Sequence, residues 1–175
     1  HHAMSLTTPL TRNVRDDRRP TDMAAYEANG GYQGLRAALA QSPENCLQVL
    51  KDSNLRGRGG AGFPTGMKWS FVPMGDKCSP GHKYLICNAD EMEPGTFKDR
   101  LLLECDPHQL IEGMIVSAYT LQADVAYIFI RAEYHQATRL LQEAIAACHE
   151  KGYLGQDILG TGYQLEMHVH SSAGR

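Results

Sequence analysis

The sequence predicts an α/β fold in which helices and parallel strands form three layers, α/β/α, behind an extended or helical N-terminal arm. Two short apolar runs, residues 83–88 and 125–130, suit buried strands, and residues 165–170 alternate weakly as a third. Between these runs, apolar residues recur at helical spacing over 110–121 and 137–148. Strands that alternate with helices form βαβ units with right-handed crossovers, so we expect a parallel, Rossmann-like sheet.

The region before the first predicted strand divides into three parts. Residues 1–3 precede Met4 and resemble the remnant of a purification tag. Residues 5–30 are polar, which is typical of either an extended surface arm or a disordered tail. Residues 31–50 regain helical spacing, and Ser42 followed by Pro43 predicts a second helix start. We therefore expect an arm over 1–30 and one α/β domain over 31–175. We expect this domain to be incomplete at its C-terminal end, because the chain stops beside the edge where such sheets bind ligands.

Composition excludes several classes of function. The chain has 175 residues, 42% of them hydrophobic and 21% charged, with a formal net charge of −3. A protein with this net charge has no strong positive field to attract nucleic acid or an anionic membrane. The sequence also lacks the run of 18 or more apolar residues that a membrane-spanning helix needs. The five cysteines include no C-x-x-C pair, so neither structural zinc nor an iron–sulfur cluster is indicated. Cys148 falls on the apolar face of a predicted helix and is expected to pack there.

Residues 56–66 form a glycine-rich loop, with five glycines among eleven residues. Such a loop exposes backbone N–H groups to an anion, and Arg58 and Lys68 add positive charge. The spacing also fits G-x-G-x-x-G, but no clear strand precedes it and Pro64 interrupts the expected helix. On this feature alone, a flexible turn is a better explanation than a nucleotide site. Phe63 either stacks on a ligand ring or anchors the loop in the core.

An acidic loop follows the first predicted strand. Asn88 ends the strand, Asp90, Glu91 and Glu93 follow, and residues 94–95 form a Pro-Gly bend. Carboxylates at the carboxyl end of a strand can accept hydrogen bonds from ribose hydroxyls or a carboxamide. A solvated charge cluster is the alternative, and a metal site is less favoured because the acidic loop itself holds no histidine or cysteine to complete a soft ligand set.

The histidines point to structure rather than chemistry. His108 begins a predicted helix after a proline, and no Ser-His-Asp order is evident. His168 and His170 would face the same side of a strand. That spacing is compatible with a metal ion, but a polar sheet face explains it more simply.

Two long motifs then make a family resemblance specific. Residues 55–69 read LRGRGGAGFPTGMKW and residues 87–100 read CNADEMEPGTFKDR. With the Pro-His pair at 107–108, Glu-Gly-Met at 112–114, Tyr-Ile-Phe-Ile-Arg at 127–131 and Ala-Gly-Arg at 173–175, these motifs resemble the FMN- and NADH-binding flavoprotein subunit of respiratory complex I. The resemblance covers most of the chain from about residue 12 onward.

The resemblance implies an NADH:quinone oxidoreductase flavoprotein. In that family an α/β domain holds FMN, NADH stacks on the flavin and passes it a hydride, and electrons then leave singly through iron–sulfur clusters to quinone. The segment for the nicotinamide nucleotide matches Gly57, Arg58, Gly59, Gly60, Ala61, Gly62, Phe63, Pro64, Thr65 and Gly66. The flavin contacts match Arg58, Gly59, Lys68, Asn88, Asp90 and Glu91, and Glu93 matches a carboxylate that touches the nucleotide. No catalytic residue or metal ligand is assigned within this chain.

Family members continue far beyond residue 175. The missing part carries further nucleotide contacts, a ubiquitin-like domain and the cysteines of a 4Fe-4S cluster. The expected partners are NADH, a thioredoxin-like 2Fe-2S subunit and the large iron–sulfur subunit of the peripheral arm, with no nucleic acid and no membrane insertion. The expected location is cytoplasmic, peripheral on the cytoplasmic side of the inner membrane. The alternatives are a diaphorase subunit of an NAD-linked hydrogenase or formate dehydrogenase, or a non-catalytic fragment without bound flavin.

Overall fold

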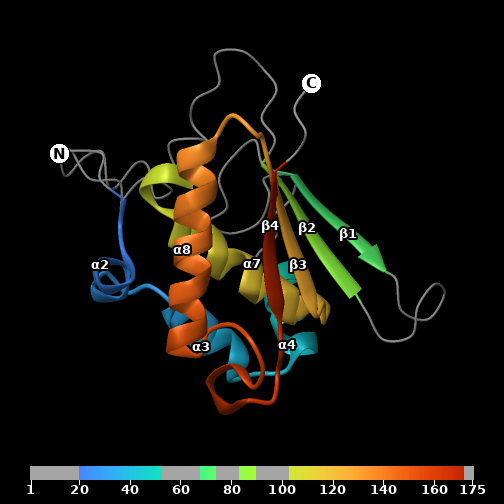
Figure 1. Cartoon of the computed structure of the whole chain (residues 1–175). Helices are drawn as coiled ribbons and strands as arrows, with labels where there is room; N and C mark the ends of the chain where they lie inside the picture. Colours follow the sequence, from blue (N-terminus) through green and yellow to red (C-terminus); the bar gives the residue numbers. More distant parts are fainter. Residues whose placement is uncertain (1–19, 53–67, 74–82, 90–102, 172–175) are drawn as a thin grey trace.

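The computed structural model describes residues 20–52, 68–73, 83–89 and 103–171 (Figure 1). In chain order, the elements are α2 (Met23–Ala28), α3 (Gln33–Leu39), α4 (Pro43–Asp52), β1 (Lys68–Pro73), β2 (Lys83–Ala89), α7 (Pro107–Leu121), β3 (Val125–Ile130), α8 (His135–Lys151), the 3-10 turn η2 (Ile158–Gly160) and β4 (Glu166–Ser171).

The strands form one sheet in the order β1-β2-β3-β4. Strands β2, β3 and β4 are parallel and are joined by α7 and α8, which confirms the predicted α/β fold with a parallel, Rossmann-like sheet. Strand β1 was not predicted and pairs antiparallel with β2, with Lys68 opposite Asn88. The described sheet is therefore mixed, with one antiparallel strand at its edge.

One face of the sheet carries the core. Alternate residues of β2 and β3, with Met167 of β4, are buried on this face and join a single cluster with the apolar sides of α7 and α8. Both helices lie on the same face because each right-handed crossover leads to the next strand in the same direction along the sheet. Helices α3 and α4 contact α7. A helical layer on the opposite face, which the α/β/α arrangement requires, is not among the described residues.

The predicted signals for the start of α7 and for the end of α8 are confirmed. Helix α7 has Pro107 in its first turn, where a missing N–H costs nothing, and ends at Gln122 in a left-handed conformation. Helix α8 ends at Gly152, whose φ of 81° suits a residue without a side chain. The predicted break between α3 and α4 is also confirmed, because Ser42 Oγ accepts a hydrogen bond of 3.1 Å from the backbone N–H of Asn45.

The described end of the N-terminal arm is helical. Of the two forms predicted for the arm, extended or helical, residues 23–28 take the helical one and form α2 behind Asp22 as N-cap, so a disordered tail is wrong for them. The sequence shows no helical spacing of apolar residues here, because Tyr26 is the one buried residue of α2. Gly31 closes the following turn, and a Cβ at that position would lie 2.1 Å from the Tyr26 ring. Residues 1–19 lie outside the described part, and the boundary at residue 30 remains a prediction.

Glu112 of α7 fixes this helical arm to the domain. Its Oε1 accepts hydrogen bonds from the Tyr26 hydroxyl at 2.6 Å and from the Tyr32 backbone N–H at 2.9 Å, and its Oε2 accepts one from the Leu35 N–H at 2.9 Å. Tyr32 is the N-cap of α3 and its side chain does not cap the helix. The Glu112 carboxylate therefore takes the place of an N-cap side chain as the acceptor for the Leu35 N–H, and it also satisfies the N–H of Tyr32 itself.

Tyr32 is buried between α7 and α8. Its hydroxyl lies 2.6 Å from His108 Nδ1 and 3.0 Å from Cys148 Sγ, and its ring stacks on Tyr153 with the centroids 4.1 Å apart. Burial raises the pKa of the Cys148 thiol to about 12. The prediction that Cys148 packs in the core is confirmed, and His108 has a structural place beside it.

Candidate functional site

The carboxyl ends of the parallel strands meet at one edge of the sheet. Ile130, the last residue of β3, pairs with Ala89 on one side and with Ser171 on the other. Strand β1 runs the opposite way, so its first residue, Lys68, lies at this edge beside Asn88. The chain therefore enters β1 from the glycine-rich segment and leaves β2 into the acidic segment at the same edge. Parallel α/β sheets bind their ligands at this edge.

Two of the predicted site residues lie in the described part of the chain. Lys68 and Asn88 are register partners, so the fold brings the ends of the two motifs together. Asn88 is exposed, and its neighbours in β2, Cys87 and Ala89, face the core. The other predicted site residues lie outside the described residues, namely Gly57, Arg58, Gly59, Gly60, Ala61, Gly62, Phe63, Pro64, Thr65, Gly66, Asp90, Glu91 and Glu93.

The face of the sheet opposite the core carries a group of rings. Tyr127 is central, with its ring centroid 6.0 Å from Tyr84, 6.2 Å from Phe129 and 5.3 Å from His168. His170 contacts Phe129 edge-on at 5.1 Å. Periodicity predicts residues 125–130 only as a buried run, and the finer signal is that the aromatic residues Tyr127 and Phe129 alternate with the buried aliphatic residues of the strand. His168 and His170 are exposed on the same face as expected, and the described residues contain no group of three potential metal ligands.

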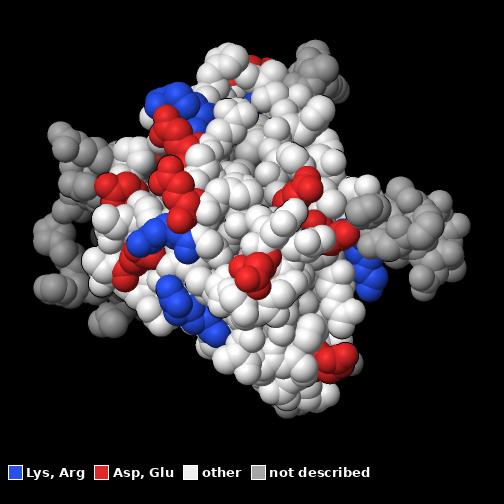
Figure 2. Space-filling model, turned by 60° about the horizontal axis from the view of Figure 1, so that its bottom comes forward, with Lys and Arg blue, Asp and Glu red and all other residues white. Residues whose placement is uncertain are grey.

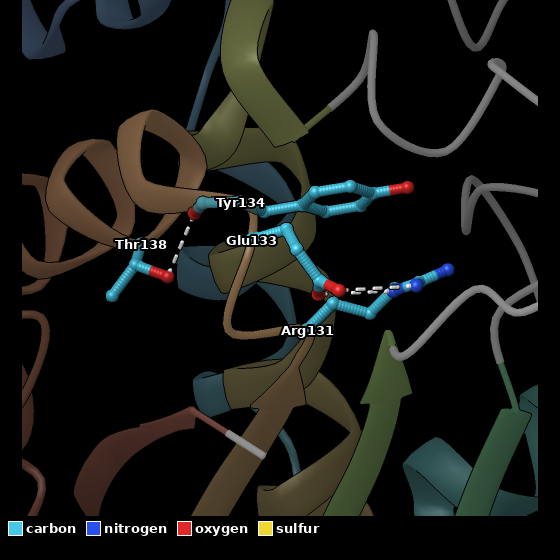
Figure 3. A network of polar contacts seen from close by, with 4 residues as sticks. All are labelled: Arg131, Glu133, Tyr134 and Thr138. Atoms are coloured by element: carbon cyan, nitrogen blue, oxygen red, sulfur yellow. Dashed lines mark hydrogen bonds and ion pairs between the residues drawn. The ribbon is translucent and has the colours of Figure 1, made fainter. Parts of the chain in front are cut away.

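A polar network follows β3 at the same edge (Figure 3). Arg131 Nε lies 3.3 Å from Glu133 Oε1, and the guanidinium carbon lies 6.0 Å from the centre of the Tyr134 ring. A backbone hydrogen bond and the Arg131 side chain hold the pKa of Glu133 below its usual range. The Thr138 hydroxyl donates to the Tyr134 carbonyl at 2.9 Å, which ties the network to the first turn of α8. The sequence motif that ends at Arg131 gives no separate role to this arginine.

On the face shown in Figure 2, acidic and basic side chains are interspersed. The four cysteines in the described ranges are all buried and carry no disulfide. Across those same ranges, no helix combines the length and apolar character that crossing a bilayer requires.

Comparison with known proteins identifies the family. The model of the Nuo51 FMN-binding domain matches residues 50–175. The NADH-quinone oxidoreductase F 2 subunit of Rhizobium meliloti (strain 1021) is 58% identical over 153 residues, 87% of this chain and 36% of that protein. The F subunit of the Escherichia coli (strain K12) NADH-quinone oxidoreductase is 51% identical over 170 residues, 97% of this chain and 38% of the relative. The corresponding F subunit of Aquifex aeolicus (strain VF5) is 53% identical over 149 residues, 85% of this chain and 34% of the relative.

The chain thus spans little more than a third of the length of these curated relatives. The family match nevertheless includes β1, β2, β3 and β4 together with the glycine-rich and acidic segments of the sequence. This chain belongs to the family of the Nuo51 FMN-binding domain.

Proposed function

We propose that this chain forms part of the flavin- and nucleotide-binding domain of an NADH:quinone oxidoreductase of the complex I class. The observation that carries the proposal is the family match over residues 50–175. The topology adds support, because Lys68 and Asn88, which lie close in sequence to the glycine-rich and acidic segments, are register partners at the edge where parallel sheets hold their ligands.

The described edge suits an anionic cofactor such as FMN. Helix α8 begins at this edge, which places the positive end of its dipole there. The side chain of its N-cap residue, Tyr134, makes no capping hydrogen bond to the first turn. Arg131 adds a guanidinium group beside the same turn. Asn88 offers an exposed amide that can both donate and accept hydrogen bonds. These groups match the charge and the polar rim of a flavin nucleotide.

Each motif has a role within this proposal. The segment from Gly57 to Gly66 receives NADH with Phe63 against one of its rings, and Glu93 contacts the same nucleotide. Residues Arg58, Gly59, Lys68, Asn88, Asp90 and Glu91 surround the flavin. FMN, when bound, accepts a hydride and releases electrons one at a time. The protein holds the two ligands in the orientation that hydride transfer needs and keeps water from the reacting atoms.

The partners follow from the same assignment. NADH is the reductant, and other complex I subunits receive the electrons, with the thioredoxin-like 2Fe-2S subunit and the large iron–sulfur subunit as neighbours. The chain then works at the cytoplasmic side of the membrane, within a membrane-associated complex. The names of the relatives favour quinone oxidoreduction over a diaphorase of an NAD-linked hydrogenase or formate dehydrogenase.

A spectrum and an activity assay test the proposal on the natural full-length polypeptide. Bound flavin absorbs visible light at about 450 nm, and the chromophore extracted from the protein can be identified as FMN. We expect about one flavin per chain and NADH-dependent reduction of ferricyanide. A colourless protein that takes up no FMN when reconstituted, and that does not oxidise NADH, would contradict the proposal.

A further inference from the structure

We propose that Arg131 binds a phosphate group of a nucleotide at the carboxyl edge of the sheet. This inference rests on the proposed function, because it adds a residue to the site that would hold FMN and NADH. Arg131 directly follows β3, the middle strand of the parallel three, and the preceding residue, Ile130, pairs with the last residues of both neighbouring strands. Its position is therefore at the centre of the edge.

The Arg131 side chain is held in place by its neighbours. Its Nε lies 3.3 Å from Glu133 Oε1 and its Nη2 lies 3.4 Å from Glu133 Oε2, while the Tyr134 ring lies beside the guanidinium group. Figure 3 shows Arg131 and Tyr134 extending side by side, away from the body of α8, with the Glu133 carboxylate next to the guanidinium. The side chain is thus oriented before any ligand arrives.

The contacts with Glu133 are weak for a charged pair. Strong charge-assisted hydrogen bonds between arginine and a carboxylate measure about 2.7–2.9 Å, and both contacts here are longer. A guanidinium group carries several N–H donors in a fixed fork, so it can contact a carboxylate and a bound oxyanion at the same time. The contact with Glu133 therefore does not by itself prevent the guanidinium group from binding a phosphate.

A second arginine of the same helix region shows what an ordinary surface pair looks like. Arg139 lies 3.3 Å from Glu143 at the i,i+4 spacing of α8, and both side chains are 61% exposed. Such pairs contribute little to stability and have no directional role. The Arg131 side chain is only 30% exposed, lies against an aromatic ring and follows a strand rather than a helical turn. Arg139 is therefore a matched control for Arg131.

The chemistry of the ligand follows from the group that recognises it. A guanidinium fork matches two oxygens of a phosphate. Both ligands of the proposed function carry this chemistry, FMN as a monophosphate and NADH as a pyrophosphate. The nearby carboxylate of Glu133 repels a phosphate, so removing its charge leaves the arginine site intact and lowers the repulsion.

The experiment compares ligands with and without phosphate on the natural full-length protein. Flavin-depleted protein is titrated with FMN and with riboflavin by flavin fluorescence. Flavin-loaded protein is assayed for the KM of NADH and of reduced nicotinamide riboside, which lacks phosphate. The variants are Arg131→Gln, Arg131→Lys, Glu133→Gln and the control Arg139→Gln.

We expect Arg131→Gln to weaken binding of the phosphorylated ligand about ten-fold, the loss of one charged hydrogen bond. Riboflavin and reduced nicotinamide riboside should bind as in the unmodified protein. A loss confined to FMN assigns the flavin phosphate, and a loss confined to NADH assigns the pyrophosphate. Arg131→Lys should retain part of the affinity, Glu133→Gln should retain or improve it, and Arg139→Gln should change nothing.

Three results would overturn the inference. One is an Arg131→Gln protein that binds FMN and NADH as the unmodified protein does. Another is an equal loss for ligands with and without phosphate, which indicates a purely structural role. The third is a Glu133→Gln protein as weak as Arg131→Gln, which shows that the pair acts as a structural unit. If the unmodified protein binds neither FMN nor NADH, the proposed function itself fails.

Discussion

Protonation of His108 is expected to destabilise the fold in mildly acidic solution. The side chain is 2% exposed, and its Nδ1 lies 2.6 Å from the Tyr32 hydroxyl. Burial lowers the pKa of His108 from 6.5 to about 4, against the weaker opposing effect of Asp22 and Glu27. Because the folded protein prefers the neutral ring, the unfolded chain binds more protons between these two pH values.

Acidification from about pH 6.5 to about pH 4 should lower the free energy of unfolding. The contribution of His108 to stability is fully present above about pH 6.5 and is lost as the pH falls toward about 4. A difference of about 2.5 pH units corresponds to about 3 kcal/mol at 1.36 kcal/mol per unit. The steepest part of the loss should have a slope near about 1.4 kcal/mol per pH unit, since one proton is taken up.

Urea unfolding at several pH values between 4 and 7 measures this loss. A His108→Gln variant removes the titrating group and keeps a hydrogen-bond acceptor for Tyr32, although its stability at pH 7 should fall. We expect its free energy of unfolding to vary with pH by about 3 kcal/mol less than that of the unmodified protein over this range. The exposed His135, replaced by glutamine, is the control for removing a histidine from the surface. An unchanged pH profile in the His108 variant would show that the buried ring does not control acid stability.

Other predictions test the helical arm and the proposed site. Glu112→Ala should lower the free energy of unfolding by about 2–3 kcal/mol in urea, because buried N–H groups lose their acceptor. Gly31→Ala should cost about 1–3 kcal/mol, since the new Cβ meets the Tyr26 ring, and a fully stable variant would show that the ring can move. Phe63→Ala should raise the KM for NADH while FMN remains bound; an unfolded variant would instead mark Phe63 as a core residue. Residues 1–175 alone should fold, retain little FMN and fail to reduce ferricyanide with NADH, and a yellow, active fragment would contradict this.

Sequence periodicity predicted the elements whose apolar residues face one core. Helices α7 and α8 and strands β2, β3 and β4 are all of this kind. Strand β1 was missed because it follows the glycine-rich segment directly and its pairing with β2 is not encoded in its own pattern. The left-handed conformation of Tyr32 was also invisible, since its φ of 65° depends on the turn at Gly31 and on the Glu112 carboxylate rather than on the residue type.

The candidate site was predicted from motifs rather than from geometry. The motifs named Lys68 and Asn88, and the sheet register placed the two side by side. The phosphate contact that we propose for Arg131 could not be predicted from the sequence. It depends on the end of β3 lying between two other strand ends and on the Tyr134 ring beside the guanidinium group. Such proximity arises only when strands that are distant in the sequence have paired.

The burial of the cysteines has a consequence for oxidative damage. A reduced flavin that meets dioxygen releases peroxide, and peroxide oxidises thiolates rather than thiols. Cys46, Cys87, Cys105 and Cys148 are all buried, and burial raises the pKa values of Cys46 and Cys148. These two thiols therefore stay protonated at the pH of the cell, and burial limits the access of solvent to all four. The thiols of the described residues thus react slowly with the oxidants that a flavoenzyme of the proposed kind would generate.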